Sequence, residues 1–150
     1  MEKITPSDEY LHLESDIMPK NADALRQLID DSSFTLAEHI RRAAALYQLS
    51  IEMYEKGGDI YSISQSGPEV IPLFDINVGD TDERVKLSVK NINSEVAKLF
   101  EKLGIDDANP NTTVLDNVIN HYYEATVRAK KGDKIFVESP DGTKNELLFV

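Results

Sequence analysis

The stretch Arg84-Val85-Lys86-Leu87-Ser88-Val89-Lys90 alternates strictly between polar and apolar side chains. A period of two is typical of a strand that buries one face and exposes the other. We therefore expect Val85, Leu87 and Val89 to face the core. The opposite face of this strand would carry Arg84, Lys86, Ser88 and Lys90.

A second alternation lies near the beginning of the chain, in Glu9-Tyr10-Leu11-His12-Leu13-Glu14-Ser15. Its pattern predicts a strand with Leu11 and Leu13 turned inward. The outward positions would be Tyr10, His12 and Glu14. Because each strand is followed by two helical patterns and then by a hairpin pattern, the chain is expected to contain two similar units.

The first unit continues with a short apolar stripe at helical spacing, which the polar residues 30–33 interrupt. A longer helix is expected to begin at Thr35, with Glu38 completing a capping box. Lys56-Gly57-Gly58 would end that helix, because glycine tolerates the left-handed conformation found at helix ends. The two stripes consist of Ala22, Leu25, Leu28 and Ile29, and of Leu36, Ile40, Ala43, Ala44, Tyr47, Ile51 and Tyr54.

The second unit repeats this order after its strand. Asn93 is a good N-cap for a short helix that would end at Gly104, and residues 106–111 are expected to form a loop. Thr112 or Thr113 would begin the next helix, which Lys130-Lys131-Gly132 would end. The stripes of these two helices consist of Val96, Leu99, Phe100 and Leu103, and of Val114, Val118, Ile119, Tyr122 and Ala125.

A β-hairpin is expected at the end of each unit. In the first, Tyr61 and Ile63 alternate with serines, Ser66-Gly67-Pro68 forms the turn, and the chain returns as an apolar run over 70–74. In the second, apolar residues 135–137 and 147–150 flank the turn sequence Ser139-Pro140-Asp141-Gly142.

These patterns predict an α+β fold that is mainly helical. The first unit would span residues 9–74 and the second residues 84–150, with the polar segment 75–83 as a linker. The repeat rests on matched order more than on identical residues. The alternative is a pair of unrelated helical hairpins that both end in β-hairpins.

A short alternating strand, a short helix, a turn and a longer capped helix make this chain resemble the ribbon-helix-helix superfamily, which includes the MetJ and Arc repressors. The residues that carry the resemblance are 84–100 and 33–58, particularly the helix start Thr35-Leu36-Ala37-Glu38. The resemblance implies that two units pair their strands into an antiparallel ribbon. The two units of one chain would then form a pseudo-dimer, unless they pair between two chains as a homodimer.

The resemblance further implies a DNA-binding transcription regulator whose ribbon reads base edges in the major groove of double-stranded DNA. The outward strand positions Arg84, Lys86, Ser88, Lys90, Tyr10 and His12 would then contact the DNA. The helix starts at Thr35 and at Thr112 or Thr113 would each face a phosphate, because free N–H groups there suit an anion.

The charge of the chain supports a different hypothesis. Its 27 acids and 16 bases give a formal net charge of −11, which repels a phosphate backbone. Asp30, Asp31 and Glu38 lie around the first expected phosphate position. The alternative function is therefore an acidic, non-enzymatic protein-interaction module on a repurposed ribbon-helix-helix fold, with a basic protein as its partner.

No pattern points to catalysis, and we expect neither an enzyme nor a cofactor. The chain has no cysteine, no glycine-rich phosphate loop and no nucleophile with an obvious base. Its three histidines, His12, His39 and His121, lie on different expected elements, so no metal site is expected. Without an apolar leader pattern or a run long enough for a membrane helix, the expected location is the cytoplasm.

Overall fold

The computed structural model describes residues 10–74, 85–93, 98, 102 and 112–148. Over these residues the fold is α+β, with three helices and two small antiparallel sheets, and roughly half of it is helical. The expected helix between residues 93 and 104, the loop 106–111, the linker 75–83 and Arg84 lie outside the described residues, apart from Asn93, 98 and 102.

The first sheet is a two-stranded ribbon of β1 (Tyr10–Ile17) and β4 (Val85–Asn93), which pair antiparallel. Leu13 lies opposite Val89, and Asp16 lies opposite Lys86, with a register shift between Leu11 and Leu13. Both strands are longer than the alternating patterns indicated. The reason at β1 is that Ile17 is buried and continues the pairing up to the first helix.

Helix α2 (Pro19–Asp30) begins earlier than its apolar stripe suggested. Pro19 takes the first helical position, where a missing N–H costs nothing. The stripe itself is confirmed for Ala22, Leu25 and Leu28, which are buried, while Ile29 is only half-buried.

Helix α3 (Leu36–Glu55) begins as expected, because the Thr35 hydroxyl accepts a hydrogen bond from the Glu38 N–H at 3.2 Å. The Glu38 half of the expected capping box is wrong, since its carboxylate binds Arg41 and Arg42 instead. Tyr54 was expected in the core but is 53% exposed. Its ring lies near the end of α3 and meets the Phe74 ring edge-on, and Phe74 is itself 54% exposed.

Helix α5 (Thr112–Lys130) buries Val118, Ile119, Tyr122 and Ala125 as expected. Its stripe differs at the first position, where Leu115 is fully buried and Val114 only half-buried. Three polar residues that no apolar pattern could select are buried on the same helix. They are Asp116, Asn117 and His121.

The second sheet has the strand order β3-β2-β5-β6 and joins the two expected hairpins. Its strands are β2 (Asp59–Ser64), β3 (Gly67–Val70), β5 (Lys134–Glu138) and β6 (Lys144–Leu147). Both return strands begin earlier than the apolar runs that were expected to form them. In the first hairpin, Gly67 already pairs with Ser64, so the turn is Gln65-Ser66 rather than 66–68. Pro68 is tolerated in β3 because this strand lies at the edge of the sheet.

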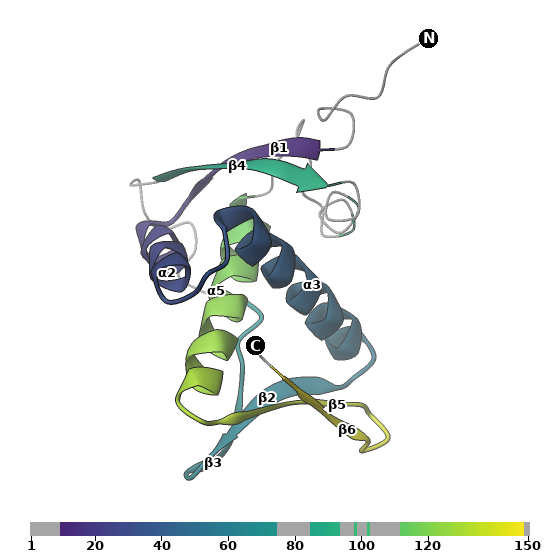
Figure 1. The fold of residues 1–150 in the computed structure, drawn as a ribbon. Coiled ribbons are helices and arrows are strands. Elements are labelled where there is room, and N and C mark those ends of the chain that lie inside the picture. The colour runs from purple at the N-terminus through teal and green to yellow at the C-terminus, as the bar shows by residue number, and fades with distance from the viewer. Residues whose placement is uncertain (1–9, 75–84, 94–97, 99–101, 103–111, 149–150) are drawn as a thin grey trace.

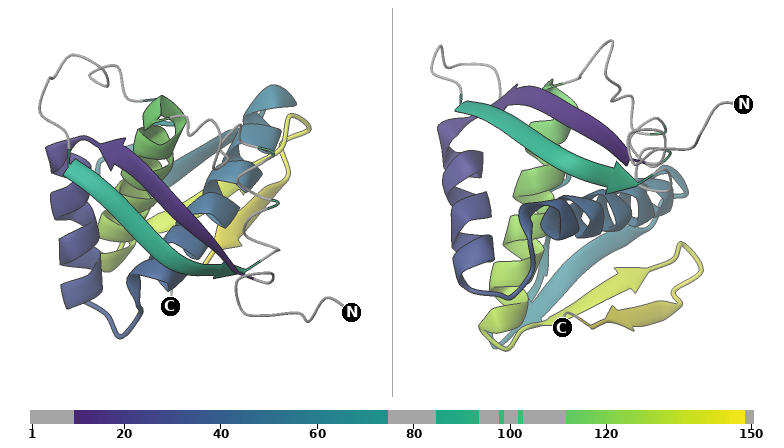
Figure 2. Two further views of the ribbon diagram at one scale, coloured as in Figure 1. Left: turned by 90° about the horizontal axis from the view of Figure 1, so that it is seen from above. Right: turned by 45° about the horizontal axis from the view of Figure 1, so that its top comes forward.

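The elements form three layers (Figure 1). The ribbon β1–β4 crosses one end of the helices, seen from above in Figure 2, and the four-stranded sheet covers the other end. A main apolar cluster lies between ribbon and helices, and a smaller one lies between α5 and the second sheet. The ribbon contributes Ile17, Leu87 and Val89 to the main cluster.

Candidate nucleic-acid interface and adjoining cavity

The outer face of the ribbon is polar on β4. Lys86 and Ser88 are exposed, while Leu87 and Val89 between them are buried, as the alternating sequence predicted. Asp16 of β1 is also exposed and lies opposite Lys86 in the ribbon. The sequence interpretation had not included Asp16, because the strand was expected to end before it. This face therefore carries charges of both signs.

The other expected contact positions are placed by their backbone alone. Tyr10 and His12 lie in β1, and Lys90 lies in β4. Thr112 and Thr113 are the first two residues of α5. The exposed Thr35 is the N-cap of α3. This end of α3 lies beneath the ribbon in Figure 1.

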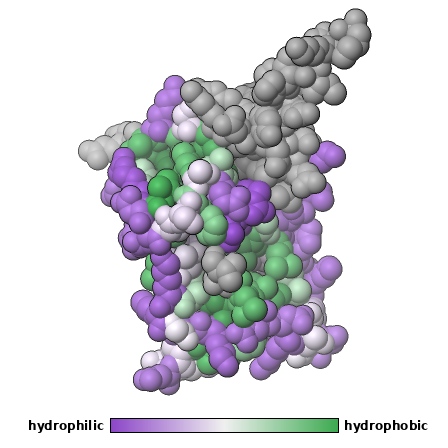
Figure 3. All heavy atoms as spheres, in the orientation of Figure 1, coloured by the Kyte–Doolittle hydropathy of each residue, from purple (hydrophilic) through white to green (hydrophobic). Residues whose placement is uncertain are grey.

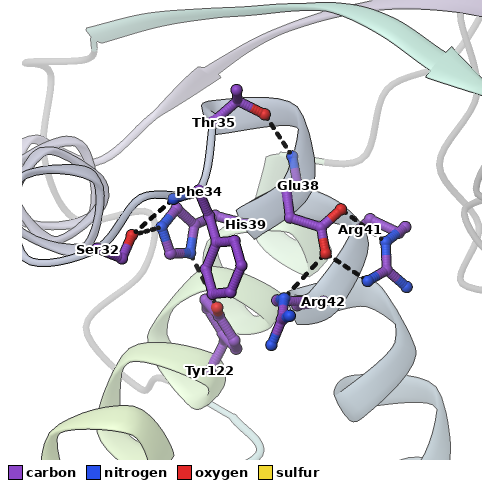
Figure 4. A network of polar contacts seen from close by, with 8 residues as sticks. All are labelled: Ser32, Phe34, Thr35, Glu38, His39, Arg41, Arg42 and Tyr122. Carbon is purple, nitrogen blue, oxygen red and sulfur yellow. Dashed lines mark hydrogen bonds and ion pairs between the residues drawn. The ribbon is translucent and has the colours of Figure 1, made fainter. Parts of the chain in front are cut away.

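Glu38 in the first turn of α3 is held by two arginines (Figure 4). Arg41 donates from Nε to Glu38 Oε1 at 3.0 Å, and Arg42 donates from Nε to Oε2 at 2.9 Å. The Arg41 and Arg42 guanidinium groups lower the pKa of the Glu38 carboxyl to about 2. The negative charge that the sequence places at this helix start is thus locally compensated.

His39 is buried behind this cluster and uses both ring nitrogens. Its Nε2 lies 2.8 Å from Ser32 Oγ, and its Nδ1 lies 2.9 Å from the Tyr122 hydroxyl. Since the Ser32 hydroxyl donates its proton to the Leu28 carbonyl, His39 Nε2 must be the donor to Ser32. Its Nδ1 then accepts from Tyr122. Burial lowers the pKa of His39, so the ring is neutral at pH 7.

A cavity of about 690 Å³ opens beside His39, between the α2–α3 connection, α3, α5 and the end of β6. Arg42 lies over the Phe34 ring, with its Cζ 3.9 Å from the ring centroid. Lys130 Nζ lies 3.6 Å from Asp31 Oδ2 at the rim. The cavity therefore combines an apolar interior with several charged groups.

His121 occupies a closed site between the same two long helices. Its Nδ1 lies 2.7 Å from the Pro72 carbonyl, and its Nε2 lies 2.8 Å from Ser50 Oγ. A carbonyl can only accept, so Nδ1 carries the proton and Nε2 accepts from Ser50. Burial lowers the pKa of His121 to about 4. The Tyr47 ring packs edge-on against His121.

Asp116 is fully buried and joins α5 to the start of α2. Its Oδ1 accepts from the Met18 N–H at 3.0 Å and from Asn21 Nδ2 at 2.7 Å. These bonds supply an acceptor for a backbone N–H at the N-cap of α2, where no helical carbonyl is available. Asp116 is thus a structural anchor.

The chain matches no family model, and no curated protein and no solved structure matches it. Within the described ranges, no helix is long and apolar enough to cross a membrane. The same residues contain no group of three histidine and carboxylate side chains that could hold a metal ion.

Sequence reasoning missed the residues of the cavity, because they come from four separate segments. His39 and Tyr122 are 83 residues apart, and only tertiary structure brings them together. The one local signal was the sequence Phe34 to Arg42, in which an aromatic ring, a histidine and two arginines fall within three helical turns. That signal is too common on helices to define a site.

Proposed function

We propose that this protein is a single-chain ribbon-helix-helix pseudo-dimer that binds double-stranded DNA and acts as a transcription regulator. The observation that carries the proposal is the two-stranded ribbon, which exposes Lys86 and Ser88 and buries Leu87 and Val89. An antiparallel ribbon of this kind fits the major groove, which is about 12 Å wide.

The register of both sheets supports a two-fold relation between the halves. In a symmetric dimer, the residue on the axis pairs with its own copy. Leu13 and Val89 are each the last inward apolar position of their alternating sequence, and these two residues lie opposite each other in the ribbon. In the second sheet, Tyr61 lies opposite Phe136 and the two rings stack, with centroids 6.0 Å apart.

The ends of the long helices support the same relation. Gly57 and Gly132 follow α3 and α5, and both have positive φ angles of 92° and 100°. The separation of 75 residues between them equals that between Tyr61 and Phe136. This equal spacing is what a duplication of one unit would produce, and it supports the proposed relation between the halves.

The start of α3 would contribute a phosphate contact beside the ribbon. The first N–H groups of a helix have no intrahelical partner and favour an anion. Glu38 would oppose this contact if its charge were unpaired, but it is bound by Arg41 and Arg42. The acidic sequence around Thr35 is therefore less unfavourable to phosphate than its composition suggests.

Fluorescence anisotropy with a labelled mixed-sequence duplex tests the proposal, between about 20 and 200 mM salt. We expect affinity to fall steeply with salt, and Lys86→Glu to weaken it about tenfold or more. Lys56→Glu is the matched control, because it makes the same charge change on an exposed residue at the far end of α3. Equal losses from both variants would leave only a general charge effect.

The removal of the acid opposite Lys86 provides a second arm. Asp16→Asn should strengthen DNA binding, since a carboxylate on the groove-facing surface repels phosphate. If the protein does not bind the duplex even at about 20 mM salt, the regulator proposal fails.

The exposed Asp16 favours a second candidate, an acidic module that binds a basic protein through the ribbon. A lysine-rich peptide is a suitable probe for this function. Its binding should disappear with Asp16→Lys and persist with Lys86→Gln, whereas a DNA-binding ribbon predicts the opposite ranking for the duplex. Retention of peptide binding by Asp16→Lys would exclude the ribbon as the binding surface.

A further inference from the structure

We propose that the cavity beside His39 binds a small organic anion with an apolar body, such as an aromatic carboxylate. This site shares Arg41 and Arg42 with the start of α3 but none of the described residues on the ribbon's outer face, and its occupancy can be measured without DNA. The proposal therefore stands or falls independently of the proposed DNA-binding function.

The dimensions and lining of the cavity suit such a molecule. Its volume of about 690 Å³ falls within the range of roughly 300–1,000 Å³ that is usual for small-molecule sites. Leu28, Phe34, Leu46 and Ala129 supply apolar walls. Hydrophobic residues gather on the face shown in Figure 3, between hydrophilic borders. An apolar ring would replace water against these walls.

The charged side chains select the sign of the ligand. Arg41, Arg42 and Lys130 line the cavity, whereas Asp31 is the single carboxylate among the described lining residues. Glu38 lies just outside and binds both arginines, whose guanidinium groups each carry five N–H donors. Cations outnumber acids among the described lining residues, in a chain with 27 acids and 16 bases. This local reversal of sign favours an anionic ligand.

Two groups are placed to receive a carboxylate. Arg42 rests on the Phe34 ring, which orients a planar guanidinium that suits two-point binding of a carboxylate. Lys130 and Asp31 are half-exposed and 3.6 Å apart, and such surface pairs are worth little. A ligand carboxylate can therefore take the place of Asp31 at Lys130 with little loss.

His39 forms a fixed, neutral part of the wall. Ser32 and Tyr122 occupy both of its ring nitrogens, so the ring neither turns nor competes with the cations for the ligand. The Ser32 hydroxyl also accepts from the Phe34 N–H at 3.2 Å, which holds the Phe34 end of the connection. The arrangement exists before any ligand enters, which reduces the ordering cost of binding.

Isothermal titration calorimetry of the full chain with 1-naphthoate tests this proposal, with neutral 1-naphthalenemethanol as the uncharged comparison. We expect saturable 1:1 binding of naphthoate and at least about tenfold weaker binding of the alcohol, because only the carboxylate forms charge-assisted hydrogen bonds. No naphthoate binding up to about 5 mM, or equal binding of the two compounds, would overturn it.

Three variants locate the binding. Arg42→Gln should lower naphthoate affinity about tenfold, and Ala45→Phe should abolish it by filling the cavity from α3. Arg26→Gln is the matched control, since Arg26 is exposed on α2 and pairs with Asp23 outside the cavity. If Arg42→Gln fails to fold, Lys130→Gln takes its place with an expected loss of several-fold. Unchanged affinity in the cavity variants, or an equal loss in the Arg26 variant, would refute the site.

Discussion

Each of the two long helices carries a tyrosine at the same distance from its end, but the two tyrosines lie in different surroundings. Tyr47 of α3 and Tyr122 of α5 each lie ten residues before the positive-φ glycine that follows their helix. Each tyrosine contacts a histidine from the other helix, Tyr47 with His121 and Tyr122 with His39. Around His121 the packing is closed, whereas His39 lies beside the cavity.

The difference comes from the segments that follow the two hairpins. After β3, the Pro72 and Leu73 carbonyls accept from His121 and Tyr47, at 2.7 Å and 2.8 Å. After β6, the described residues Leu147 and Leu148 line the cavity without filling it, and Leu148 is 81% exposed. The same pair of helices thus encloses a sealed core on one side and borders an open cavity on the other.

The largest expected difference between the two sides comes from removing each histidine in turn. His121→Ala should lower the free energy of unfolding by about 3–4 kcal/mol, because it leaves a cavity and unpairs the Ser50 hydroxyl and the Pro72 carbonyl. His39→Ala should cost about 1–2 kcal/mol, since water from the cavity can reach its partners. Urea unfolding of both variants measures the difference. Equal costs would contradict the distinction between a closed and an open side.

The pH dependence of stability should follow His121. Its pKa in the folded chain is about 4 against 6.5 in the unfolded chain, so the unfolded state binds more protons between these values. The contribution is complete above pH 6.5, and about 3 kcal/mol of it is lost as the pH falls to 4. Urea unfolding at several pH values measures this loss, and His121→Gln should flatten the profile in that window. A profile that His121→Gln leaves unchanged would assign the loss to other groups.

Removal of each tyrosine hydroxyl should also lower the free energy of unfolding more on the closed side than on the side of the cavity. The difference should be smaller than for the histidines. Tyr47→Phe leaves the Leu73 carbonyl unpaired in a partly buried site and should cost about 1–1.5 kcal/mol. Tyr122→Phe should cost less than about 1 kcal/mol, because a cavity water can donate to His39 Nδ1. Thermal unfolding of the two variants, scanned together, decides between this order and its reverse.

The smallest expected effect concerns the cluster at the start of α3. Glu38→Gln should cost about 0.5–1 kcal/mol, since it removes a partly exposed ion pair and a favourable charge at a helix start. Glu52→Gln on the same helix is the control, with an expected change below about 0.5 kcal/mol because Glu52 is exposed and its carboxylate accepts from the neutral Gln48 side chain. High salt should reduce the Glu38 effect. Insensitivity to salt would argue against an electrostatic origin.

Local patterns predicted most of the elements in the described part of the chain. The alternation at 85–89 predicted the burial of Leu87 and Val89, although Val85 is only half-buried, and Thr35 predicted the start of α3. The glycine turn before Thr143 predicted the second hairpin. The errors lay at boundaries and in the last turn of α3. There, the exposure of Tyr54 depends on which residues pack beside it in the fold, and no local period contains that information.

Local patterns likewise predicted part of the ribbon surface but not the cavity. The alternating sequence selected Lys86 and Ser88, but it could not place Asp16 beside them, because the pairing of β1 with β4 joins residues about 70 apart. The cavity residues were not selected at all. Arg42 becomes a candidate site residue only because the fold places Phe34, Tyr122 and Lys130 around the same cavity.

The sequence by itself determined the order of strands and helices, the caps and turns, and the polar outer face of β4. These follow from short-range rules of spacing, backbone conformation and side-chain polarity. Only the tertiary structure decided that Asp16 lies opposite Lys86 in the ribbon, that His121 is sealed while His39 borders a cavity, and that Asp116 anchors α2. These features depend on contacts between segments that are distant in the sequence. Burial and hydrogen bonding arise from those contacts and cannot be read from any one segment.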